Sequence, residues 1–334
     1  MNSRERVIKA LRFDRPDRAP RHLWHLPGIA LLRRDELETV QKKYPDDFTG
    51  APVRYGASRR ASGTPNVVGK YTDAWGCVWS VAEPGVIGEV KGPPLADWSA
   101  LERYTPPYEL LEEADLSAVN PFCAETDKFV MESIGNPFER MQYLRGPEAL
   151  YMDLAYGADE MLKLRDMVHA FNLQSLEMLC ETDVDAISFA DDWGSQNSLL
   201  ISPNLWRELF KPLYADYCRI AHAAGKFAFM HSDGNITAIY PDLIEVGVDA
   251  LNSQLFCMDI EELGRLYKGK LTFWGEIDRQ RILPFGTADE VRAAVRRVRA
   301  ALGDGNGGVI AQCEWGINVP RENIEAVFEA WLGP

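Results

Sequence analysis

The sequence predicts an α/β protein of the (β/α)₈ TIM-barrel class, and two observations lead to this prediction. Short apolar, β-prone runs alternate with amphipathic helical patterns, and eight such strand–helix units can be counted. Reactive side chains follow these strands, whereas the opposite strand ends carry ordinary turns such as Gly225-Lys226 and Gly269-Lys270. An open doubly wound sheet is the alternative, but the sequence lacks the glycine-rich phosphate loop of its dinucleotide-binding form.

The clearest unit lies at residues 226–246. The run Phe-Ala-Phe-Met at 227–230 has the pattern of a buried strand, and Ala224-Gly225 ends the helix before it. His231 and Asp233 follow this strand directly, ahead of the next helix. Because active sites of this fold lie where strands end and βα loops begin, the unit indicates a functional strand end.

The remaining elements repeat the same plan, after an amphipathic helix over residues 3–11. Further strands are expected at residues 19–24, 47–53, 128–134, 186–190, 250–253, 271–274 and 309–312. Further helices are expected at about residues 29–43, 138–145, 147–156, 158–182, 203–223, 236–246, 260–267, 288–302 and 321–332.

Residues 54–125 interrupt the alternation. They contain short β-prone stretches, a proline-containing linker at 104–107 and an acidic helical run at 109–116. We expect residues 1–334 to form a single barrel domain with a β-rich, partly irregular insertion at about 54–125, after the second strand. Trp75 and Trp79 are expected to pack this insertion over the barrel.

Composition narrows the class of protein. The 334 residues are 46% hydrophobic and 26% charged, which is typical of a globular chain with a sizeable core. A net charge of −14 argues against non-specific binding to nucleic acid or anionic membranes. The N-terminus is charged where a signal peptide needs an apolar run, so we expect a cytoplasmic protein. The six cysteines show no pairing pattern, which indicates free thiols.

The strand ends supply the candidate site residues. The expected catalytic residues are the imidazoles and carboxylates that follow the first, fourth and seventh strands: His22, His25, Asp191, Asp192 and Glu276. The expected substrate-binding residues are aromatic or polar neighbours: Trp24, Trp193, Gln254 and Asp278. Structural alternatives stay open, because a buried histidine can belong to the core and the aspartates can cap a helix.

Several segments resemble the uroporphyrinogen decarboxylase superfamily, and the resemblance covers nearly the whole chain. The matching segments are Ser3-Arg-Glu-Arg-Val7, Arg15-Pro-Asp-Arg-Ala-Pro20, Gly135-Asn-Pro-Phe-Glu-Arg140, Asp191-Asp-Trp-Gly-Ser-Gln196, Ile201-Ser-Pro203, His231-Ser-Asp-Gly234, Pro241-Asp-Leu-Ile-Glu-Val-Gly-Val-Asp249 and Val319-Pro-Arg-Glu-Asn323. The resemblance implies a (β/α)₈ barrel. It also implies one of two activities, decarboxylation or zinc-dependent methyl transfer.

The sequence departs from the decarboxylases after the first strand. Those proteins resemble one another in an Arg-Gln-Ala-Gly-Arg run, whose guanidinium groups hold substrate carboxylates in bidentate pairs. Here the corresponding place reads His22-Leu-Trp-His-Leu-Pro-Gly28. Both arginines are absent from this place, so we expect no turnover of uroporphyrinogen.

The methyltransferase branch has His-X-Cys after the fifth strand and a second Cys at the eighth. His231 and Cys313 match this pattern, and Asp233 stands where the first Cys would be. The resemblance therefore implies zinc held by His231, Asp233 and Cys313, with an open fourth position. Asp233 as a helix N-cap and Cys257 as a substitute ligand are the alternatives.

We therefore expect a metal (zinc)-dependent methyltransferase that acts with a corrinoid protein and a thiol or pterin acceptor. The first alternative is a decarboxylase of a tetrapyrrole or another carboxylated substrate. The second is a non-catalytic barrel that binds a small molecule. Because similar family members are often dimers, a homodimer is also expected.

Overall fold

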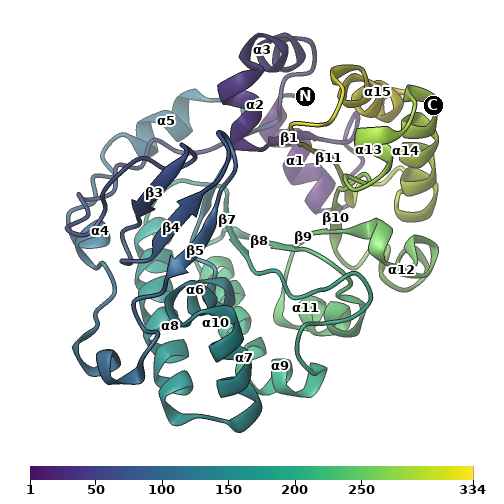
Figure 1. Ribbon diagram of the computed structural model, residues 1–334. Coiled ribbons are helices and arrows are strands. Elements are labelled where there is room, and N and C mark those ends of the chain that lie inside the picture. Colours follow the sequence, from purple (N-terminus) through teal and green to yellow (C-terminus); the bar gives the residue numbers. More distant parts are fainter. Residues whose placement is uncertain (334) are drawn as a thin grey trace.

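Eight parallel strands form a nearly closed barrel in the computed structural model, which describes residues 1–333 (Figure 1). They lie in the order β1-β11-β10-β9-β8-β7-β6-β2. The strands are β1 (Arg21–His25), β2 (Phe48–Thr49), β6 (Phe129–Ser133), β7 (Ala186–Ala190), β8 (Phe227–Ser232), β9 (Ala250–Ser253), β10 (Thr272–Trp274) and β11 (Val309–Trp315). The (β/α)₈ fold predicted from the sequence is confirmed.

The ring is completed between β1 and β2 by Asp47. Its backbone N–H donates to the Arg21 carbonyl at 3.0 Å. Its buried carboxylate accepts hydrogen bonds from Arg6 and Arg18, each at 2.7 Å. β2 is much shorter than the expected strand at 47–53. Its backbone pairing with β1 is sparse, and the contacts of Asp47 hold its N-terminal end beside β1.

Helices surround the strands. They are α1 (Ser3–Leu11), α2 (Pro27–Leu32), α3 (Arg34–Lys43), α4 (Glu109–Glu112), α5 (Val119–Glu125), α6 (Pro137–Arg145), α7 (Pro147–Tyr156), α8 (Asp159–Cys180), α9 (Pro203–Leu209), α10 (Lys211–Ala223), α11 (Tyr240–Val246), α12 (Ile260–Tyr267), α13 (Ile282–Phe285), α14 (Ala288–Leu302) and α15 (Arg321–Leu332). Within residues 1–333, every helix is too short or too polar to cross a membrane.

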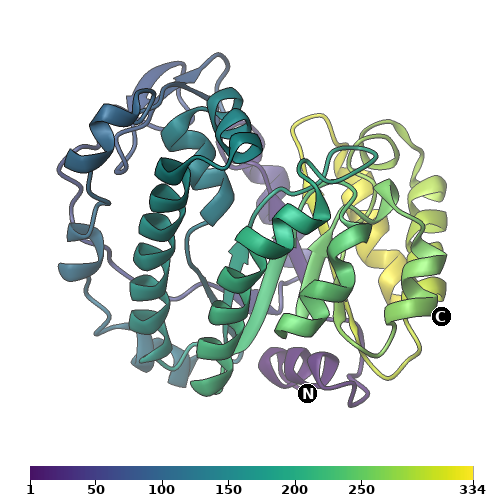
Figure 2. The ribbon, with the colours of Figure 1, turned by 90° about the horizontal axis from the view of Figure 1, so that it is seen from below.

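Helix α1 lies beneath the amino ends of the strands, at the bottom of the view in Figure 2. Its Val7 and Leu11 join the apolar cluster inside the barrel. The helix is capped by Asn2 in a capping box with Glu5, and not by Ser3 as a sequence pattern suggests. The Ser3 hydroxyl instead donates to Asp47 at 2.7 Å, so α1 is tied to the closing point of the ring.

Residues between β2 and β6 include a small antiparallel sheet of β3 (Gly69–Thr72), β4 (Val78–Val81) and β5 (Glu89–Gly92). It packs on helices α6 and α8 through tryptophans. The Trp79 ring lies 4.9 Å from Tyr143 of α6. The Trp75 ring, in the loop before β4, lies 4.7 Å from Phe171 of α8.

Strand alternation divides the barrel side chains between two cores. Phe229 and Ile310 belong to the cluster inside the barrel. Met230, Ala311 and Cys313 belong to the larger cluster between strands and helices. By the same alternation His231 faces the barrel interior and Cys313 faces away from it, a difference that decides the composition of the site.

Candidate metal centre at the barrel mouth

A cavity of about 320 Å³ opens among the carboxyl ends of the strands. The rings of His22, Trp24, Trp274 and His231 form part of its wall, and Ser133 and Ser188 add hydroxyl groups. The ring centroids of Trp24 lie 5.2 Å from His231 and 5.0 Å from Trp274. This volume is at the small end of the range for small-molecule sites, roughly 300–1,000 Å³.

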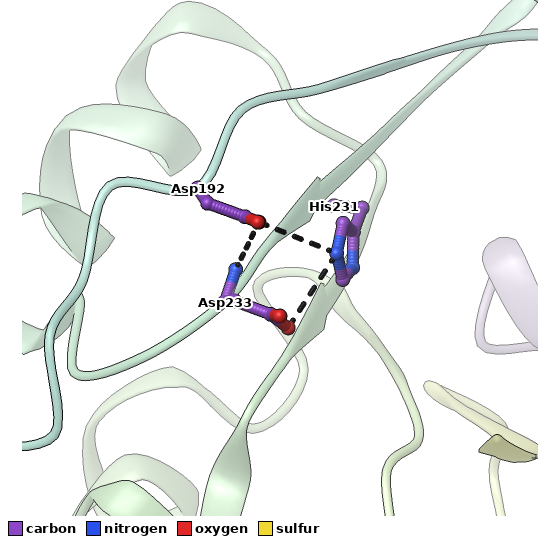
Figure 3. A group of neighbouring side chains, drawn as sticks. All are labelled: Asp192, His231 and Asp233. Atoms are coloured by element: carbon purple, nitrogen blue, oxygen red, sulfur yellow. Dashed lines mark hydrogen bonds and ion pairs between the residues drawn. The ribbon is translucent and has the colours of Figure 1, made fainter. Parts of the chain in front are cut away.

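Beside the cavity, Asp192, His231 and Asp233 point toward one another (Figure 3). One ligand atom of each lies within 4.8 Å of the others. Nε2 of His231 is 3.5 Å from Oδ1 of Asp192 and 3.5 Å from Oδ1 of Asp233. That oxygen of Asp233 is buried and has no hydrogen-bond partner among residues 1–333.

The loops after β7 and β8 bring these residues together. Asp191 and Gly194 donate backbone hydrogen bonds to the carbonyls of His231 (3.1 Å) and Asp233 (3.0 Å). Gly234 has a φ of 76°, and a Cβ added there would collide with the Gly194 backbone. Glycine at these two positions therefore lets the loops touch, which places Asp192 beside Asp233.

His231 has a fixed tautomer. Its Nδ1 lies 2.6 Å from Oδ1 of Asn252. The Asn252 amide nitrogen donates to the Trp274 carbonyl, so Oδ1 of Asn252 must be an acceptor. Nδ1 of His231 therefore donates to Asn252, and Nε2 faces the two aspartates.

Arg279 lies at the centre of a second acidic group. It donates to Oδ2 of Asp233 and to Oε1 of Glu314 (2.9 Å), and its Nε is 3.8 Å from Oε2 of Glu276. Burial alone would lower the pKa of Arg279, but Glu276, Asp233 and Glu314 raise it above its ordinary value. The guanidinium is therefore charged and fully engaged with carboxylates.

Among the carboxyl groups around His231 and Arg279, Asp192 and Glu276 have raised pKa values. Burial, reinforced by Asp233, raises the pKa of Asp192 to about 6. Burial raises the pKa of Glu276 well above its usual range despite the opposing charge of Arg279. Such shifts are common where a protein concentrates acidic groups for binding or catalysis.

Cys313, predicted as the third metal ligand, is outside the group. It is fully buried in the core between strands and helices, on the face of β11 opposite to Glu314. Burial raises the pKa of its thiol, which disfavours the thiolate that a metal needs. Cys313 therefore lies outside the candidate group, whose third member is Asp192.

Asp191 and Trp193 lie in buried surroundings that give them structural roles. Asp191, predicted as catalytic, is fully buried and accepts hydrogen bonds from the backbone N–H groups of Phe138 (3.0 Å) and Glu139 (2.8 Å), in the first turn of α6. Trp193, predicted to bind substrate, stacks on Phe138 at 4.1 Å and has no exposed surface. The first residue therefore caps a helix, and the second packs in the core.

The two histidines after the first strand are apart from the group of Asp192, His231 and Asp233. His22 stacks on Phe48 at 4.4 Å, and burial lowers its pKa to about 3. His22 is therefore a stacked ring in the cavity wall, where burial disfavours its protonated form. His25 is on the outward face of β1, and its Nδ1 approaches the Leu26 carbonyl at 3.5 Å.

The other predicted residues lie at the barrel mouth in different settings. Trp24 lines the cavity, and Glu276 is buried beside Arg279. Gln254 accepts a hydrogen bond from the Gly234 backbone at 2.8 Å, so it fixes the loop after β8. Asp278 accepts from the backbone of Gln280 and Arg281, each at 2.9 Å, and shapes the loop before α13.

Sequence reasoning missed the site roles of Arg279 and Asn252. Arg279 stands five residues after Trp274, and its position beyond a strand end was the available signal. Asn252 is inside β9 and is indistinguishable by sequence from other strand residues. Asp192 was predicted as a catalytic group, and its place beside His231 and Asp233 was not predicted.

The residues present fit a divalent cation. A neutral imidazole nitrogen and two carboxylate oxygens are common ligands for zinc and similar ions. The bare, buried oxygen of Asp233 is the observation that points to a bound group, because a buried carboxylate oxygen without a partner is costly.

Comparisons with solved structures show similar barrels. A methyltransferase from Methanosarcina mazei is 17% identical, with a TM-score of 0.69 over 99% of this chain and 98% of that chain. An endo-β-1,4-xylanase from Gloeophyllum trabeum is 11% identical, with a TM-score of 0.49 over 98% and 99%. A search of curated protein sequences found no match.

A protein-family comparison identifies the sequence itself. The model of uroporphyrinogen decarboxylase (URO-D) matches residues 73–332, which is well over half of the chain and includes the strand ends that carry Asp192, His231, Asp233 and Arg279. The chain belongs to the uroporphyrinogen decarboxylase (URO-D) family.

Proposed function

We propose that this protein is a metal-dependent methyltransferase, with zinc as the first candidate metal, and that Asp192, His231 and Asp233 bind the metal. The single observation that carries the proposal is this group of three ligand atoms within 4.8 Å at the barrel mouth. The methyltransferase from Methanosarcina mazei, which shares the fold along its full length, supports the choice of reaction. A corrinoid protein as methyl carrier and a thiol or pterin as acceptor complete the proposal.

The residues of the chain have separate tasks in this scheme. Asn252 accepts a hydrogen bond from Nδ1 of His231 and so turns Nε2 toward the two aspartates, and the Asp233 backbone N–H donates to Oδ1 of Asp192 at 3.0 Å. The rings of Trp24 and Trp274 give the cavity an aromatic wall. A metal bound beside the cavity would supply a Lewis acid that favours the thiolate form of a thiol acceptor.

Arg279 favours a second candidate function, decarboxylation of a carboxylated substrate, because guanidinium groups bind carboxylates. This function ranks second for two reasons. Arg279 already has three carboxylate neighbours, so a substrate carboxylate must compete with them. The 320 Å³ cavity also suits a small acceptor better than a molecule of four pyrrole rings.

Metal content tests the proposal. We expect about one metal ion per chain in the wild type after dialysis, and a loss of that metal in His231→Ala with the fold retained. Cys313→Ser is the matched control and should keep its metal, because Cys313 faces away from the group. Equal metal content in the wild type and His231→Ala would contradict the site.

Activity then separates the two reactions. The metal-loaded wild type should transfer methyl groups from methylcobalamin to a thiol, and His231→Ala should lose this activity. Release of CO₂ from uroporphyrinogen at a catalytic rate, with no methyl transfer, would instead support the second candidate.

A further inference from the structure

Asp233 presents its two carboxylate oxygens to different neighbours. Oδ2 accepts a hydrogen bond from Arg279. Oδ1 is buried, lacks a hydrogen-bond partner among residues 1–333 and lies 3.5 Å from Nε2 of His231. A carboxylate without such a contact can rotate about its Cβ–Cγ bond and offer a cation either oxygen or both. Here the contact with Arg279 fixes which oxygen faces the group of three.

Arg279 is itself held by two further carboxyl groups, one on β11 and one in its own loop. Glu314 on β11 accepts from its Nη1 at 2.9 Å, and Glu276, just after β10, lies 3.8 Å from its Nε. Only 19% of the Arg279 side chain is exposed. A planar guanidinium fork suits three such contacts, which a lysine ammonium cannot reproduce in the same directions. Arg279 therefore cannot follow Asp233 if that carboxylate turns.

His231 and Asp192, the other two members of the group, are held by hydrogen-bond partners that adjoin or belong to the group. Asn252 on β9 holds His231, and the Asp233 backbone holds Asp192. The carboxylate orientation of Asp233 depends on Arg279, from the loop after β10. Residues that orient metal ligands in this way typically contribute 10–100-fold in metal affinity.

We propose that Arg279 is a positioning residue of the metal centre, which holds Asp233 so that Oδ1 alone faces the cation. Its charge also offsets those of Asp233 and Glu314, so that these carboxylates can lie together inside the barrel mouth. The inference rests on the proposed function, because it requires that Asp192, His231 and Asp233 bind a divalent cation.

Cobalt(II) binding to the metal-free protein tests this inference without any substrate. In Arg279→Met we expect about 10–100-fold weaker Co²⁺ binding than in the wild type. The visible absorption of bound Co²⁺ should also change, because Asp233 becomes free to bind through both oxygens. Arg281→Met, an exposed arginine in the same loop, is the matched control and should behave as the wild type.

Two further variants keep the test decisive if Arg279→Met does not fold. Arg279→Lys keeps the charge but loses the fork, and Glu314→Gln weakens the support of Arg279 without touching Asp233. Both variants should bind Co²⁺ more weakly than the wild type, but the loss of affinity should be smaller than in Arg279→Met.

The outcomes distinguish the inference from the proposed function. Unchanged Co²⁺ affinity and spectrum in the Arg279 variants would overturn the inference alone. Tighter binding would overturn it as well, because Arg279 would then act as a competing cation. If the wild type binds no Co²⁺, the proposed function fails, and the inference falls with it.

Discussion

Asp191 and Asp192 are adjacent carboxylates with opposite surroundings. Asp191 has no exposed surface, and it accepts two backbone N–H bonds and one from the Tyr214 hydroxyl at 2.5 Å. The side chain of Asp192 is 41% exposed and faces His231. Donors that surround a carboxylate give it a structural role, whereas an oxygen directed toward an imidazole and a second carboxylate can bind a cation.

The raised pKa of Asp192 has a consequence for stability. Its ordinary value is 3.8 and its folded value is about 6, so the folded state binds more protons between these pH values. The free energy of unfolding should therefore fall as pH rises from about 4 to 6 and stay lower above pH 6.

We therefore expect Asp192→Asn to stabilise the metal-free protein at pH 7.5 while it weakens metal binding. The gain should be about 1 kcal/mol, well below the full pKa shift, because solvent screens a side chain that is 41% exposed. Urea unfolding at pH 7.5 and pH 4 measures it, and the difference from the wild type should vanish at the lower pH. A destabilised variant at pH 7.5 would show that Asp192 is a structural residue.

The residue types at the site were predictable from the sequence. The face of the strand to which each side chain points was only partly predictable. His231 and Asp233 were found because reactive groups follow a strand end, where the barrel fold places them. Cys313 shares that position along its strand, yet its parity along β11 turns it outward. A shift of one residue reverses the face of a strand, and sequence reasoning did not fix that register.

At the scale of elements, α6 begins without a cap of its own. Asn136 precedes it but makes no side-chain cap hydrogen bond. Asp191, from the loop after β7, supplies the missing acceptor for the N–H groups of Phe138 and Glu139. The helix start and the loop that presents Asp192 are therefore joined by one carboxylate.

Asp191→Asn should consequently weaken the fold and leave the metal centre intact. We expect the free energy of unfolding to fall by about 1–3 kcal/mol, because the amide nitrogen of asparagine cannot accept the hydrogen bonds that one carboxyl oxygen of Asp191 accepts. Urea unfolding together with metal analysis of the folded fraction measures both effects. Loss of metal without loss of stability would contradict this expectation and show that Asp191 contributes to the metal centre.

Strongly periodic elements were predicted well, whereas elements fixed by distant contacts were not. Helix α14 (Ala288–Leu302) matches the predicted range, because its apolar stripe and its Thr287–Glu290 capping box are both local signals. β2 is two residues long where seven were expected, since its surroundings depend on Asp47, Arg6 and Arg18. Those contacts join residues far apart in the sequence.

For the whole molecule, the count of strand–helix units was enough to predict the barrel. Eight units close into a ring whatever their loops contain. The fold can therefore be predicted even where the predicted ends of single elements are wrong. The site is less predictable, because His231 is at the end of β8 while Asp192 and Asp233 are on two loops held together at Gly194 and Gly234. The fold could therefore be predicted more completely than the site.

The molecule as a whole should respond to metal through the same loops. A cation that binds the folded state but not the unfolded chain stabilises it by about 2.7 kcal/mol at 100 times its dissociation constant. Zinc should therefore raise the melting temperature of the wild type in a concentration-dependent way, and the rise should disappear in His231→Ala. Asp278→Asn is the control, because Asp278 is a carboxylate of the same rim that accepts backbone hydrogen bonds outside the group. Equal zinc-dependent shifts in all three proteins would mean that zinc binds elsewhere on this acidic chain, and the metal centre at Asp192, His231 and Asp233 would have to be abandoned.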